Sequence, residues 1–136
     1  MSFRWPALVL LLLSGNAYSY EFPVEIFEYV DNIKVVAFIN ESDIDETVSW
    51  QPFQGPPPLS IGSAIEAIQG YISSDSRLPN ASLMEIKLQQ IPHHDAHWHY
   101  LVKIKTETGD KTRYDYFVIL MNSKIIPAVR EPQSYK

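Results

Sequence analysis

The chain of 136 residues contains no cysteine, so no disulfide can stabilise its fold. It is also short of positive charge, with 11 lysine and arginine residues against 16 aspartate and glutamate residues. The net charge of −5 makes nucleic acid and anionic membrane surfaces unfavourable partners. Neither a Gly-x-Ser-x-Gly elbow nor a His-Glu-x-x-His motif occurs. We therefore assign no catalytic residue and expect a protein that is not an enzyme.

The first 19 residues have the pattern of a secretory signal peptide. Arg4 supplies a positive charge, residues 7–13 form an apolar run, and Ala17 and Ser19 are small residues where a signal peptidase reads the chain. We expect cleavage after Ser19, a periplasmic or secreted protein, and no membrane insertion after cleavage. An uncleaved N-terminal anchor is the alternative. Export without disulfides is more typical of bacteria than of eukaryotes.

The remaining residues, 20–136, predict a single α+β domain, with one α-helix packed on an antiparallel β-sheet. Ser60 is a good N-cap, and apolar residues recur at helical spacing (Ile61, Ala64, Ile65, Ile68, Ile72), so a helix is expected to end near Ser73. Three runs that alternate apolar and polar residues follow at 82–91, 97–106 and 112–121, and these predict strands.

Two turns set the expected strand pairings. Gly109 is suited to the first central position of a type II′ turn, which places Val102 opposite Phe117 in a hairpin. Asp31-Asn32 separates two strand-like runs within residues 22–40, which predicts an extra N-terminal hairpin. Residues 124–129 are expected to add an edge strand, and 130–136 a polar tail.

Three surfaces are candidates for binding a partner: the proline-rich loop, one face of the predicted sheet and the turn 93–99. The proline-rich loop 50–58 either exposes Trp50 and Phe53 for recognition or is a stiff connector whose aromatic side chains tuck under the sheet. The second face of the predicted sheet, around Leu101, Tyr116 and Leu120, is too apolar to face open water. We expect either the N-terminal hairpin or another molecule to cover it.

All four histidines fall within seven residues. Neutral imidazoles at alternate positions of a strand lie on one face, where they could share a Zn, Cu or Ni ion with a nearby carboxylate. The alternative is a polar turn with solvated histidines. The candidate metal ligands are His93, His94, Asp95, His97 and His99.

The order of one helix and three strands resembles PepSY domains over residues 59–129. The segments that carry the resemblance are 59–68 at the helix opening, 98–105, 108–110 and 114–118 in the central hairpin, and 122–126 at the final turn. The resemblance implies an exported, non-catalytic module that binds or inhibits partners such as peptidases. The N-terminal hairpin is additional to the family pattern.

The sequence thus predicts an exported binding or inhibitory module of the bacterial cell envelope, acting on a protein or peptide and needing no cofactor. The alternative is a metal-binding or metal-sensing periplasmic protein that uses the histidines.

Overall fold

The computed structural model describes residues 22–45 and 48–131. The expected signal peptide and residues 132–136 of the expected tail lie outside this range. Within it, no helix is long and apolar enough to cross a membrane. The elements in chain order are β1 (Val24–Val30), β2 (Ile33–Ile39), a short 3₁₀ helix (Glu41–Asp43), α1 (Ile61–Ser73), β3 (Ser82–Ile91), β4 (His94–Thr108), β5 (Lys111–Leu120), β6 (Ile125–Pro127) and β7 (Val129–Arg130).

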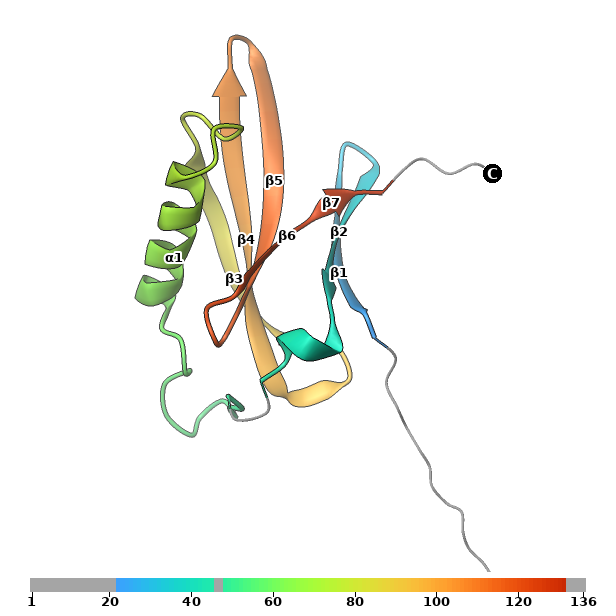
Figure 1. The fold of residues 1–136 in the computed structure, drawn as a ribbon, viewed down its shortest axis with the longest axis vertical. Coiled ribbons are helices and arrows are strands. Elements are labelled where there is room, and N and C mark those ends of the chain that lie inside the picture. The colour runs from blue at the N-terminus through green and yellow to red at the C-terminus, as the bar shows by residue number, and fades with distance from the viewer. Residues whose placement is uncertain (1–21, 46–47, 132–136) are drawn as a thin grey trace, which may run out of the picture.

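The elements form three layers (Figure 1). The middle layer is a four-stranded antiparallel sheet in the order β3-β4-β5-β6. Helix α1 covers one face of this sheet, and the three-stranded sheet β1-β2-β7 covers the other. The prediction of an α+β fold with an extra N-terminal hairpin is confirmed.

The helix-side core follows the predicted register. Gly109 has a φ of 62° in the β4–β5 turn, and Val102 lies opposite Phe117. Ala64 and Ile68 of α1 pack in the same core as these two side chains. The core of apolar side chains drives the packing of the helix on the sheet.

Two details of the helix stripe differ from the prediction. Ile61, in the first turn, is 51% exposed, and the buried residues of the helix are Ala64 and Ile68. Tyr71 packs edge-on against Phe117 instead, with ring centroids 5.3 Å apart. Aromatic side chains are long enough to reach the sheet from the margin of the stripe.

The N-terminal hairpin covers the second face of the sheet. Leu101, Tyr116 and Leu120 are 3%, 7% and 3% exposed, packed in one core with hairpin side chains such as Ala37 and Ile39. Of the two covers that the sequence left open, the hairpin is the one present, so these three candidate binding residues do not lie on an exposed surface. Strands that are apolar on both faces need a layer on each side, and this chain supplies both layers itself.

Strand boundaries also differ at two places. Between the predicted strands 82–91 and 97–106, the turn is only Pro92-His93, with His93 at a φ of 67°, and β4 already begins at His94. The last segment does not form one strand: β6 pairs with β5, whereas β7 crosses to pair with β2. The segment from β6 to β7 thereby links the two sheets, and Arg130 belongs to β7 and not to the tail.

Candidate functional site

The proline-rich loop 50–58 is fixed where it begins. The backbone N–H of Trp50 donates to the carbonyl oxygen of Ala96 at 2.9 Å. The indole Nε1 donates to the carbonyl oxygen of Gly55 at 3.1 Å. The Trp50 ring also meets the Trp98 ring edge-on, with centroids 5.5 Å apart and an interplanar angle of 77°. Trp50 therefore follows the second prediction for this loop: it is half-buried against the sheet.

The loop is fixed again where it ends. The Tyr100 hydroxyl donates to the carbonyl oxygen of Leu59 at 2.7 Å, and Ser60 caps α1 by accepting from the backbone N–H of Ser63 at 3.1 Å. Ala96 and Tyr100, which hold the two ends of the loop, both belong to β4. The loop is thus held across a single rigid strand.

Phe53, at the tip of this loop, follows the first prediction. It is 104% exposed, more than any other large apolar side chain among the described residues. Its φ of 72° lies in the left-handed region, which aromatic residues rarely adopt. Gly55 follows with a φ of 104°. Prolines at positions 52 and 56–58 restrict the backbone conformations that the loop can adopt. The backbone therefore holds Phe53 in its outward position.

The histidines do not form one cluster. His93 is exposed in the turn, and the ring of His94 lies 5.3 Å from that of Phe22 and 6.2 Å from that of His97. His99 is fully buried and lies opposite Gln89 and Leu120 in the sheet. His97 and His99 point to the same side of β4 as predicted, but the fold encloses His99. In the described ranges, no three His, Cys, Asp or Glu side chains gather in a geometry that could hold a metal ion.

His99 is electrostatically unusual. Burial lowers the pKa of its imidazole from 6.5 to about 4, because the charged form would lose its hydration. Neither ring nitrogen has a hydrogen-bond partner among the residues that the structure describes. A neutral imidazole is therefore held between the two sheets.

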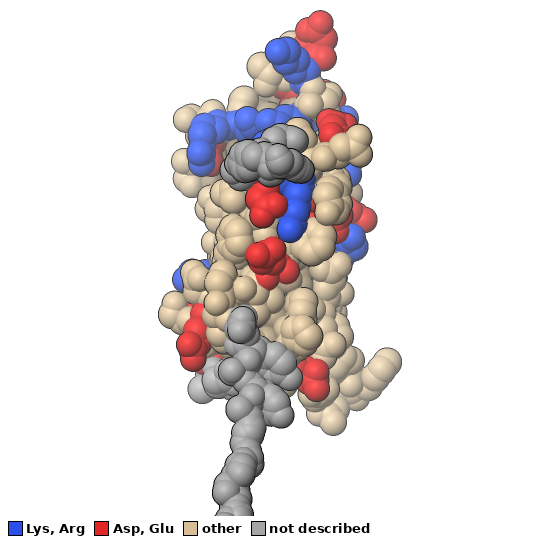
Figure 2. Space-filling model, turned by 90° about the vertical axis from the view of Figure 1, so that its right-hand side faces the viewer, with Lys and Arg blue, Asp and Glu red and all other residues tan. Residues whose placement is uncertain are grey.

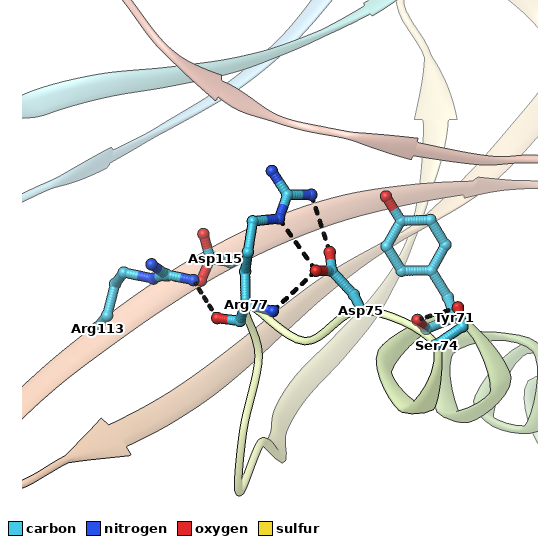
Figure 3. Close-up of polar contacts among 6 residues, drawn as sticks. All are labelled: Tyr71, Ser74, Asp75, Arg77, Arg113 and Asp115. Carbon is cyan, nitrogen blue, oxygen red and sulfur yellow. Dashed lines mark hydrogen bonds and ion pairs between the residues drawn. The ribbon is translucent and has the colours of Figure 1, made fainter.

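A polar cluster lies at the opposite end of α1 from the loop (Figure 3). Arg77 donates to both carboxylate oxygens of Asp75, at 3.0 and 2.9 Å, and its side-chain hydrogen bond is the main reason that the pKa of Asp75 falls to about 2. Arg113 donates to Asp115 at 2.9 Å and to the carbonyl oxygen of Arg77 at 3.0 Å. Both guanidinium groups have carboxylate partners within the cluster. The hydrogen bond from Arg113 to the carbonyl oxygen of Arg77 attaches the loop after α1 to β5.

Sequence reasoning missed the outer face of the β1-β2-β7 sheet. Phe27 and Tyr29 of β1 are 47% and 62% exposed, with ring centroids 5.9 Å apart. The alternation of residues in β1 could have revealed this face. Successive side chains of a strand point to opposite sides, so if Val24 and Ile26 face the core, residues 25, 27 and 29 face outward.

Comparisons with protein-family models, with curated proteins and with solved structures find nothing that matches this chain. The PepSY resemblance therefore stays an expectation.

Proposed function

We propose that this chain is an exported, non-catalytic binding protein of the bacterial cell envelope that recognises a protein or peptide by inserting Phe53 into an apolar pocket. The observation that carries the proposal is the full exposure of Phe53 on a loop that is braced at both ends. Export rests on the signal-peptide pattern of residues 1–19.

Energetics favours this use of the loop. Phe53 makes no buried contact, so it contributes little to folding. Burying a phenylalanine side chain in a partner is worth about 1.5–3 kcal/mol. Binding usually costs side-chain and loop ordering, and a loop that is already ordered avoids part of that cost. Aromatic anchors that enter a pocket are the typical hot spots of protein interfaces.

A photoreactive phenylalanine analogue placed at position 53 tests the proposal. In an envelope extract of the source cells, we expect one discrete covalent adduct after irradiation. The same analogue at position 84, an exposed apolar position on β3, is the matched control. Excess Phe53→Ala protein should fail to compete for the adduct, whereas unmodified protein should abolish it. No adduct at position 53, or the same adduct from both positions, contradicts the proposal.

Nothing in the geometry favours the metal-sensing alternative. His99 lies buried between the two sheets, away from the exposed His93. One-to-one, submicromolar binding of Zn²⁺, Cu²⁺ or Ni²⁺ in a calorimetric titration, lost in the His97→Ala/His99→Ala variant, would restore that alternative.

A further inference from the structure

Each sheet has two edges, and three of the four are protected against pairing with another chain. Strand β7 has two residues, and β6 has three and ends at Pro127. Strand β3 carries Lys87 and shifts register between Leu83 and Glu85 and between Gln90 and Ile91. Short strands, proline, lysine and bulges are the usual protections of exposed edges.

Strand β1 has none of these four protections, and its inward-facing charge, Glu28, is paired with Lys87. It pairs with β2 over seven consecutive residues without a register shift, and it contains no lysine or proline. In the sheet order β1-β2-β7, no strand of residues 22–45 or 48–131 pairs with its other edge. An edge of this length and regularity is a template for another strand.

The turn indicates which backbone groups of β1 are free. Asp31 and Asn32 have φ of 52° and 66°, typical of a two-residue hairpin turn closed by the Val30–Ile33 pair. Hydrogen-bonded and non-hydrogen-bonded pairs alternate along such a hairpin. The N–H and C=O groups of Glu25, Phe27 and Tyr29 therefore point away from β2.

The acidic residues of β1 have basic partners, and Glu25 shares Lys34 with Glu131, whose Oε1 lies 3.7 Å from the same Nζ. The Lys34 Nζ lies 3.5 Å from Glu25 Oε1 and 4.6 Å from the centre of the Phe27 ring. The inward-facing Glu28 pairs with Lys87 at 3.7 Å. Figure 2 shows the outer side of the sheet: uncharged side chains cover most of it, and acidic and basic groups lie close together near its middle.

We infer that β1 pairs with β1 of a second copy of this chain, antiparallel and centred on Phe27. A twofold axis through this point sets Phe27 opposite Phe27 of the partner subunit and Glu25 opposite Tyr29 of the partner subunit. The three facing pairs exchange about six backbone hydrogen bonds and join the two three-stranded sheets into one. The aromatic rings gain cross-strand neighbours on the outer face.

Self-complementarity selects this register. Centring the axis on Glu25 or on Glu28 sets like charges opposite each other, which destabilises a sheet. Centring it on Ile26 sets Tyr29 against Pro23 of the partner subunit, which has no N–H to donate. Only the Phe27 centre uses all three free pairs without a charge conflict.

The inference goes beyond the proposed function, because loop 50–58 and β1 lie on different sides of the molecule (Figure 1). The dimer presents two copies of Phe53. A partner with repeated sites is then held with higher avidity than by one chain.

Light scattering coupled to size-exclusion chromatography tests the association. Expressed from its complete coding sequence, the protein should have twice the mass of one chain at micromolar concentration, after mass spectrometry has fixed the mass of that chain. Phe27→Lys should give a monomer with an unchanged circular dichroism spectrum, because two lysines then face each other on the axis. Phe53→Lys, at an equally apolar and more exposed position, should remain a dimer. A monomeric unmodified protein, or a dimer that survives Phe27→Lys, overturns the inference.

Single cysteines test the register, since the chain has none of its own. Residues facing each other in a hydrogen-bonded pair have Cα atoms about 5.5 Å apart, within reach of a disulfide. Phe27→Cys should therefore cross-link to its own counterpart under mild oxidation. Tyr29→Cys should not, because the two copies of position 29 are offset by about 13 Å along the strands. Equal cross-linking of both variants contradicts the twofold centre at Phe27. Phe53→Ala protein that still forms the dimer but fails to compete for the photo-adduct separates this result from the proposed function.

Discussion

The indole nitrogen of Trp50 donates a hydrogen bond to the carbonyl oxygen of Gly55 at 3.1 Å and so closes the loop that carries Phe53. The same ring rests edge-on against Trp98 of β4. The Trp50 side chain thereby connects residues 50 and 55, on either side of the loop tip, and attaches the loop to the sheet. The exposure of Phe53 follows from this arrangement, because its neighbours in the loop are held and cannot fold over it.

Trp50→Phe keeps an aromatic ring against Trp98 but removes the indole N–H. We expect the free energy of unfolding to fall by about 0.5–1.5 kcal/mol, the net value of one hydrogen bond. Urea denaturation followed by circular dichroism measures this. Phe53→Ala is the control and should leave the midpoint unchanged, because the side chain is fully exposed. A large destabilisation by Phe53→Ala would show that the loop tip packs against the domain.

The buried imidazole of His99 makes stability depend on pH. In the unfolded chain it titrates near 6.5, and in the folded chain burial lowers its pKa to about 4. Between these values only the unfolded state binds the proton, so acidification favours unfolding. We expect this group to remove up to about 3 kcal/mol of stability as the pH falls from about 7 to below 4. Urea midpoints measured across that range give the curve.

Replacing His99 by leucine removes the group that titrates and places an apolar side chain among apolar neighbours such as Leu120 and Ile26. The difference between the two stability curves should rise below pH 6.5 in favour of His99→Leu and level off near pH 4. His93→Ala, at an exposed position in the turn, should follow the unmodified protein. Parallel curves for His99→Leu and the unmodified protein would show that His99 is hydrated in solution.

Asp43 and Lys124 join the short 3₁₀ helix to the segment between β5 and β6. The Asp43 side chain is 5% exposed and accepts hydrogen bonds from Lys124 and from the backbone N–H of Asn40. Burial alone raises the pKa of this carboxyl, but the Lys124 and Asn40 hydrogen bonds and the Lys124 charge outweigh it and bring the pKa below 3.8. The stabilisation is present above about pH 4 and is lost as the pH falls through the folded pKa.

Lys124→Met should therefore destabilise the fold by about 1–3 kcal/mol at neutral pH, because it leaves a buried carboxylate with the Asn40 N–H alone. Adding Asp43→Asn should recover part of the loss, since a neutral amide is easier to bury than a charge. Thermal unfolding of the three variants, with Asp43→Asn alone as the third, measures the coupling. Additive effects would show that the two side chains do not interact in solution.

Local patterns in the sequence were sufficient for most of the fold. Ser60 and the apolar stripe predicted α1, and Gly109 predicted the register of the β4–β5 hairpin, because caps and tight turns depend on neighbours in the chain. Alternation predicted that the sheet needed a second cover around Leu101. Which element forms this cover depends on long-range packing, so the sequence left the N-terminal hairpin and another molecule as alternatives.

The candidate sites were less predictable for the same reason. Spacing alone grouped His97 with His99, but the hairpin that encloses His99 is more than fifty residues away in the chain. Each sequence-based alternative gave Trp50 and Phe53 the same orientation. In the structure the Trp50 ring packs inward against Trp98 of β4, whereas the Phe53 ring points outward from a residue with a φ of 72°. Such side-chain directions follow from tertiary contacts that no local pattern contains.

Tyr100 tests whether β4 is the platform for loop 50–58. Its ring is buried against α1, and its hydroxyl donates to the carbonyl oxygen of Leu59 across 41 residues of sequence. Tyr100→Phe keeps the packing and removes this bond, at an expected cost of about 0.5–1.5 kcal/mol. Because Trp50 and Tyr100 hold opposite ends of one loop, Trp50→Phe and Tyr100→Phe should not be additive in a double-variant cycle. Strict additivity of the two changes in the urea midpoint would mean that each end of the loop is held independently. The loop would then not behave as one rigid element.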